Sequence, residues 1–154
     1  MAASNFTMYQ ANLDDIRIAD LVGATIKLSL HTSAYTPSVG TGGHSLASNL
    51  TNELPTGGGY TAGGVTLASP AKTAVTGGYK FSTANAQWTA SGSGIPAWRY
   101  AVLRVEGTVG GKVNPVIGYI LGDAAPADVP ATISGNPLTI SCPANGWFDK
   151  KVSV

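Results

Sequence analysis

The chain has 154 residues, with 9 Lys and Arg against 8 Asp and Glu, so its formal net charge is +1 and only 11% of its residues are charged. This length is that of one domain. So weak a positive charge argues against binding to nucleic acid or to an anionic membrane surface, because both need clustered Lys and Arg. The single cysteine, Cys142, excludes an internal disulfide and a cysteine-based zinc site.

The chain also lacks the sequence signals of membrane insertion and export. No apolar run approaches the roughly 18 to 20 residues that span a bilayer. The first residues, Met1 to Gln10, have neither the basic start nor the apolar block of a secretory signal. We therefore expect synthesis in the cytoplasm and no membrane partner.

Glycine accounts for 20 residues and proline for 9, and serine and threonine are abundant. These residues favour turns and are mediocre in helices, so the composition predicts a β protein. Low charge combined with this composition is unusual for a free monomer, because surface charge normally prevents association. The composition therefore favours a subunit of an assembly.

Residues 1–24 form an N-terminal arm that differs from the rest of the chain. Apolar residues occur at Leu13, Ile16, Ile18 and Leu21, but they do not keep a clean helical period. The arm is therefore either a short helix or an extended segment that docks on a neighbouring subunit. The third interpretation is a terminal segment that folds back on its own domain.

From Thr25 to His31 the pattern alternates strictly, with Ile26, Leu28 and Leu30 on one face and Lys27, Ser29 and His31 on the other. This predicts a half-buried antiparallel strand, with His31 on its polar face. The next segment, loop 33–59, has two prolines, many glycines and almost no periodicity. Connections of this length are uncommon in a compact domain and are usually functional or ordered by a partner.

Short strand candidates follow at a spacing of about ten residues. They are Gly64 to Ala68, Tyr79 to Thr83, Ala86 to Thr89, Tyr100 to Glu106, Val116 to Leu121, Ala131 to Ser134, Pro137 to Ser141 and Trp147 to Val154. The Tyr100 and Val116 strands predict a central hairpin with a long connection. Regular short strands predict an all-β fold, in which residues 25–154 form a single antiparallel β-sandwich of jelly-roll type.

Catalytic signals are weak. The only histidines are His31 and His44, and no Gly-x-Ser-x-Gly elbow surrounds any serine. The acids Asp123, Asp128 and Glu53 favour solvated loops rather than a glycosidase pair. We therefore expect no catalytic residue, no metal site and no cofactor.

Two further features bear on contacts. The glycine-rich stretch Gly57 to Gly64 lacks the Lys-Ser/Thr of a phosphate loop, and strand formers follow it. Its glycines instead predict positive φ angles and close backbone approach around an anchoring Tyr60. Trp98 follows Ile95-Pro96-Ala97 and is either a core residue, an exposed interface anchor or a platform for a sugar.

Six sequence blocks stand out together: Thr25 to Pro37, Asn52-Glu53-Leu54, Gly59 to Leu67, Trp88-Thr89-Ala90, Trp98 to Leu103 and Pro115 to Ile120. In this order and spacing, over about residues 25 to 122, the chain resembles a family of small structural proteins encoded by tailed bacteriophages. The chain departs from the family pattern at Leu121-Gly122-Asp123, where an acidic dipeptide with an aromatic and a glycine is common. The departure concerns local loop detail.

The resemblance implies a non-enzymatic virion component of β-sandwich type, made in the host bacterial cytoplasm and called a head decoration, neck or minor tail protein. A capsid decoration (cement) protein is our first expectation, with the major capsid protein and copies of itself, as a trimer, for partners. A neck or minor tail protein and a host-surface glycan-binding module are the alternatives. The residues that we expect at interfaces are Leu13, Ile16, Ile18, Leu21, Tyr35, Tyr60 and Trp98.

Overall fold

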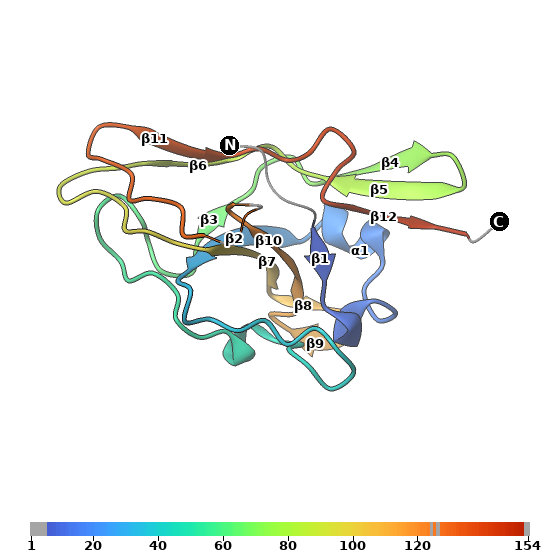
Figure 1. Ribbon diagram of the computed structural model, residues 1–154. Coiled ribbons are helices and arrows are strands. Elements are labelled where there is room, and N and C mark those ends of the chain that lie inside the picture. The colour runs from blue at the N-terminus through green and yellow to red at the C-terminus, as the bar shows by residue number, and fades with distance from the viewer. Residues whose placement is uncertain (1–5, 124, 126, 153–154) are drawn as a thin grey trace.

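The computed structural model describes residues 6–123, 125 and 127–152. The protein is mostly β, with several antiparallel sheets and a short N-terminal helix, α1 (Ile18–Val22) (Figure 1). The largest sheet has five strands in the order β1-β10-β7-β2-β3. These strands are β1 (Thr7–Met8), β10 (Val116–Leu121), β7 (Tyr100–Glu106), β2 (Thr25–His31) and β3 (Val65–Thr66).

Three smaller sheets complete the fold. A three-stranded sheet has the order β12-β5-β4, a two-stranded sheet joins β11 to β6, and a small hairpin joins β8 to β9. Their bounds are β4 (Ala71–Val75), β5 (Gly78–Ser82), β12 (Phe148–Lys151), β6 (Ala86–Thr89), β11 (Pro137–Ile140), β8 (Thr108–Val109) and β9 (Lys112–Val113). Two single-turn 3-10 helices, η1 (Gln10–Asn12) and η2 (Ala47–Asn49), lie in the arm and in loop 33–59.

Most of the predicted strands are confirmed. Strands β2, β6, β7 and β10 have the predicted bounds, and β7 pairs with β10 as the predicted central hairpin, with β8 and β9 in the connection. Strand β4 was not predicted, because its residues are largely exposed and show no apolar face. The strand predicted over Ala131 to Ser134 is wrong, since this segment makes only an isolated bridge between Thr132 and Ile95.

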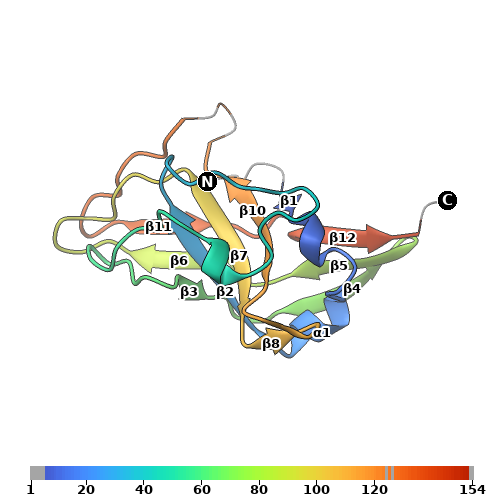
Figure 2. The same cartoon turned by 90° about the horizontal axis from the view of Figure 1, so that it is seen from below.

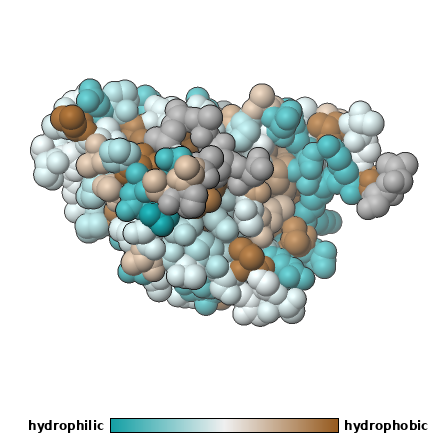
Figure 3. All heavy atoms as spheres, viewed as in Figure 1, coloured by the Kyte–Doolittle hydropathy of each residue, from teal (hydrophilic) through white to brown (hydrophobic). Residues whose placement is uncertain are grey.

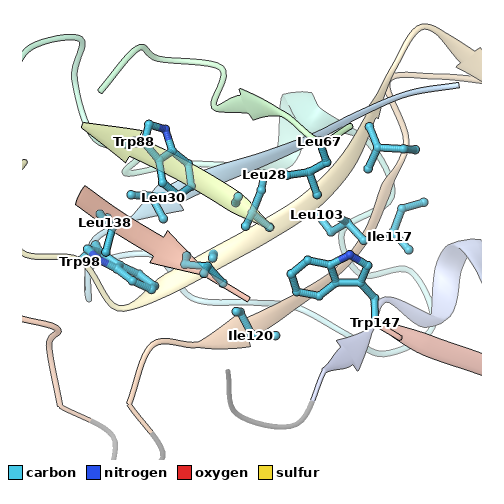
Figure 4. Close-up of a cluster of buried hydrophobic side chains, with 14 of the residues drawn as sticks. Leu28, Leu30, Leu67, Trp88, Trp98, Leu103, Ile117, Ile120, Leu138 and Trp147 are labelled. Atoms are coloured by element: carbon cyan, nitrogen blue, oxygen red, sulfur yellow. The ribbon is translucent and has the colours of Figure 1, made fainter. Parts of the chain in front are cut away.

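The main hydrophobic core lies on one face of the five-stranded sheet. Ile26, Leu28 and Leu30 of β2 are fully buried there, as their alternation predicts. They belong to one cluster with Trp88 of β6 and Leu138 of β11 (Figure 4). Burial of each such side chain contributes about 1.5–3 kcal/mol to the stability of the fold.

Part of the opposite face of the same sheet is buried too, which the alternation did not predict. Ser29 and His31 are fully buried, and Val102 and Val116 form a second cluster with Tyr9 and Tyr35. Loop 33–59 crosses this face, as the view from below shows (Figure 2). His31, on the polar face of β2 as predicted, is therefore not open to solvent, because the loop covers it.

Hydrogen bonds within the chain hold loop 33–59 on the sheet. The Leu54 N–H donates to Leu30 O at 2.9 Å, and the Val116 N–H donates to Ser45 O at 3.1 Å. The Ala47 N–H donates to Asn114 O at 2.8 Å. The loop is thus a covering layer of the domain, and the chain itself orders it.

The described part of the arm, residues 6–24, folds back on its own domain. Strand β1 pairs with β10, and Ile16, Ile18 and Leu21 are buried in the main core. Lys150 on β12 donates to the carbonyls of Leu13 and Ile16, which fixes the path into α1. Of the three interpretations, the packing agrees with the terminal segment that folds back, and this segment includes a short helix.

The predicted role of the glycine-rich stretch Gly57 to Gly64 is confirmed. Five of its glycines have positive φ, and Tyr60 between them is buried. A Cβ atom on Gly58 would lie 1.8 Å from Gly94 O, and one on Gly59 would lie 2.1 Å from Thr89 O. The backbones of two segments therefore touch where only glycine fits.

We predict that Gly58→Ala lowers the free energy of unfolding by about 3 kcal/mol or more, because it combines left-handed strain with a backbone clash. Gly92→Ala is the matched control, since Gly92 also has positive φ but a Cβ there meets no atom within 4 Å. The control variant should lose only about 1 kcal/mol. Urea unfolding of both variants measures the difference, and equal losses would contradict the backbone contact.

Candidate functional site

The residues expected at interfaces do not form a surface of the chain. Six of them are buried in the chain's own packing, and Leu13 is half-buried. The six buried residues are Ile16, Ile18, Leu21, Tyr35, Tyr60 and Trp98. A partner surface has to be sought among other residues.

Trp98 is only 1% exposed, so its core interpretation is confirmed and the exposed one is wrong. Its backbone exchanges two hydrogen bonds with Val129, and its ring lies against Gly122, where a Cβ would come within 2.8 Å of ring atoms. The indole N–H is the one buried side-chain polar atom without a hydrogen-bond partner among the described residues. Trp98 therefore cannot offer a stacking face to a sugar.

Tyr60 centres a buried hydrogen-bond network. Its hydroxyl accepts from the Leu30 N–H at 3.0 Å and donates to Glu53 Oε1 at 2.6 Å. The same carboxylate oxygen accepts from the Gly63 N–H at 2.6 Å, and Arg104 donates to Gly63 O. Burial, followed by the bond to Glu53, raises the pKa of Tyr60 far above its ordinary value, so the hydroxyl stays protonated. The network ties the C-terminal end of loop 33–59 to strand β2.

A serine–histidine pair lies under loop 33–59. Ser29 Oγ is 2.9 Å from His31 Nε2, and His31 Nδ1 is 2.8 Å from Thr51 O. The carbonyl can only accept, so Nδ1 carries the proton and Nε2 accepts from the serine hydroxyl. This geometry resembles that of a catalytic nucleophile and its base, but both side chains are fully buried. No substrate reaches the Ser29 hydroxyl while the loop is in place.

The second face also contains a tyrosine–histidine chain. The Tyr9 and Tyr35 hydroxyls are 2.5 Å apart, and Tyr35 Oη is 2.9 Å from His44 Nδ1. The ring of Tyr35 also lies against His31, with centroids 4.9 Å apart. Burial raises the pKa values of both tyrosines and lowers that of His44. These polar contacts hold the loop against the sheet, and burial favours the uncharged forms of the three side chains.

The acids weighed for catalysis take structural positions. Asp128 pairs with Arg99 at 2.8 Å, Asp123 accepts from the Ala125 N–H, and Glu53 belongs to the Tyr60 network. Within the described ranges, no three His, Cys, Asp or Glu side chains gather as a metal site would require. Cys142 is half-buried, and burial raises the pKa of its thiol.

An open groove lies between α1 and the three-stranded sheet. Arg17, Ile18, Ala19, Lys72, Tyr79 and Lys150 line its volume of about 320 Å³. Three of the six lining residues are cations, and Tyr79 is 46% exposed with Lys72 Nζ 4.1 Å from its ring centroid. We call these six residues the basic groove. The basic groove therefore has both cationic side chains and an exposed aromatic ring in its lining.

Strand β4 borders the basic groove and is an edge of its sheet. It pairs with β5 on one side only, in the register Lys72↔Phe81, Thr73↔Lys80 and Ala74↔Tyr79. Lys72, Thr73 and Ala74 are exposed. An edge strand presents unpaired backbone N–H and C=O groups, so β4 can accept a further strand. The basic groove and the β4 edge together form the candidate functional site.

The comparisons with known proteins add no relative: no family model, curated protein or solved structure matches this chain. In the part of the chain that the structure describes, no helix is long and apolar enough to cross a membrane.

We predict that Tyr60→Phe lowers the free energy of unfolding by about 1–3 kcal/mol, because the buried Leu30 N–H and the Glu53 carboxylate lose a partner. Tyr79→Phe removes the same atom from an exposed ring and should cost less than about 0.5 kcal/mol. Thermal unfolding of both variants provides the measurement. A Tyr60→Phe variant as stable as Tyr79→Phe would contradict the network.

We predict that the chain loses stability as the pH falls below about 6.5. Burial, the largest effect, lowers the pKa of His31 below its ordinary value of 6.5, and the Thr51 carbonyl and Glu53 only partly oppose this. Below pH 6.5 the unfolded chain therefore binds the proton first, and the folded state loses up to about 1.4 kcal/mol per pH unit for each such group.

Urea unfolding across this pH range measures the effect. His31→Gln should flatten the pH dependence, because the amide can still donate to Thr51 O without titrating. His44→Gln should remove a smaller part, since His44 is half-buried. An unchanged slope in His31→Gln would show that another group is responsible.

Proposed function

We propose that this chain is a non-enzymatic structural subunit of a tailed-bacteriophage virion, and specifically a decoration protein on the outer surface of the head. The observation that carries the proposal is the position of the blocks that resemble phage structural proteins. They lie on β2, β7 and β10, which are neighbours in one sheet, and on Tyr60 and β6, which pack against it. The resemblance thus covers one contiguous folding unit.

The finer fold belongs to the same proposal. The β6–β11 pair and the β12–β5–β4 sheet lie on the same side of the five-stranded sheet (Figure 1). Phe81 of β5, Trp88 of β6 and Leu103 of β7 belong to one apolar cluster between them. We propose that these layers form a single β-sandwich of jelly-roll type, in which two sheets face each other across one core.

The surface chemistry also supports a subunit of an assembly. Hydrophobic residues are dispersed among polar ones on the face shown in Figure 3, so no single apolar patch dominates it. With a net charge of +1, the chain has little electrostatic protection against association. A subunit held on a symmetric shell gains affinity from many weak contacts at once. The proposed partners are the major capsid protein and two further copies of the chain in a trimer.

A neck or minor tail protein remains the alternative, since the same fold would then form a ring with far fewer copies per particle. The glycan-binding alternative rested on Trp98 and the loop acids, and burial of Trp98 leaves it without its aromatic platform. Copy number separates decoration from a neck or tail role.

The test is quantitative mass spectrometry of purified particles, with copies of this chain counted against the major capsid protein. Decoration predicts a ratio of about one to one, because cement trimers cover the shell. A count of about six or twelve per particle would assign the chain to the neck or tail instead. Absence from particles would overturn the proposal.

A further inference from the structure

The basic groove and the β4 edge lie side by side on the three-stranded sheet. Residues paired directly across strands share a face, so Lys72, Ala74, Tyr79 and Lys150 lie on the groove face, and Thr73 and Lys80 lie on the other. Helix α1 packs against β4 and β5 on that side (Figure 1). A strand added to β4 would therefore direct every second side chain toward the groove.

The backbone of β4 is poised to bond outward. The turn Thr76-Gly77 joins Val75 to its partner Gly78, so the hydrogen-bonded pairs with β5 are Val75, Thr73 and Ala71. The alternate residues, Lys72 and Ala74, direct their N–H and C=O groups away from β5. Both are exposed. The edge thus offers an incoming strand two residues with free backbone groups.

The charges of the groove select the side chains of the incoming strand. Arg17 is paired with Asp20 at 3.0 Å, and Asp14 favours the charged form of Lys150, whose pKa burial lowers. Lys72 contacts the Tyr79 ring, and no carboxylate of the described residues forms an ion pair with it. A carboxylate opposite Lys72 would therefore gain a partner without displacing one.

We propose that the β4 edge and the basic groove bind an extended acidic peptide segment of a partner protein by strand addition. Backbone hydrogen bonds to Lys72 and Ala74 give affinity, and an acidic side chain beside Lys72 and Tyr79 gives specificity. The inference deepens the proposed function, because the partner it expects is another virion protein. A second copy of this chain is the competing occupant, and the test distinguishes it.

The probe is a synthetic peptide in which glutamate and threonine alternate, with its lysine-for-glutamate counterpart as the negative control. Amide chemical shifts of the full chain, recorded during titration, locate the peptide. We expect shifts confined to β4 and the basic groove, and weaker binding at high salt. No binding, equal binding of the lysine peptide or shifts elsewhere would overturn the proposal.

Three variants test the mechanism. Lys72→Glu should weaken binding about tenfold, because an attractive pair becomes repulsive. Lys80→Glu is the matched control, since it makes the same charge change on the opposite face of the same sheet. The affinity of this variant for the peptide should stay within about twofold of that of the unmodified chain. Ala74→Pro should abolish binding, because it removes an outward N–H that β5 does not use. Equal effects of the two lysine variants would overturn the proposal.

The thermal unfolding midpoint of each variant separates loss of binding from loss of fold. Peptide affinities are compared only among variants whose midpoint equals that of the unmodified chain. Sedimentation of the peptide-free chain tests the second copy: a dimer that Ala74→Pro dissociates would assign the edge to self-association and overturn the peptide proposal. The copy count on particles is independent of these results. Peptide binding can fail while the chain is still a virion component. Equally, the chain can bind the peptide and yet be absent from particles.

Discussion

The C-terminal half of β2 and the part of β7 that pairs with it are buried on both faces, and much of the structure depends on that constraint. One face is apolar and needs only packing. The other carries Ser29 and His31, which must find hydrogen-bond partners when water is excluded. Loop 33–59 provides the cover and, through the Thr51 carbonyl, a partner. The long connection therefore covers polar groups of the sheet, although its own regular secondary structure is limited to the single-turn helix η2.

The loop in turn depends on a few polar anchors. Glu53 and Tyr60 join its C-terminal end to the backbone of β2, and the Tyr35–His44 contact holds its first half against the second cluster. Because the loop covers this face of the five-stranded sheet, a partner protein cannot bind there. The surfaces that stay accessible to a partner include the edges of the sheets and the three-stranded sheet. This is why we propose the β4 edge, which is exposed, as the contact surface, since most of the arm's apolar side chains are buried in the chain's own core.

Sequence patterns predicted the parts of the fold that rest on local periodicity. The alternation in Ile26, Leu28 and Leu30 identified β2 and its core face, and the glycines around Tyr60 identified an anchored turn. Burial of the polar face could not be predicted, because the residues that cover it lie in a loop without periodicity. Strand β4 was missed for a related reason: an exposed edge has no apolar face to detect. The basic groove joins three segments far apart in the chain, so no local motif marks it.

We infer that the free chain orders loop 33–59 by itself, before any partner binds. Native-state hydrogen exchange of the isolated chain tests it most directly, at the amides of Ala47 and Leu54, which donate to Asn114 O and Leu30 O. We expect protection of these amides close to that of β7. Exchange at the rate of an unstructured chain would contradict it and would mean that a partner orders the loop.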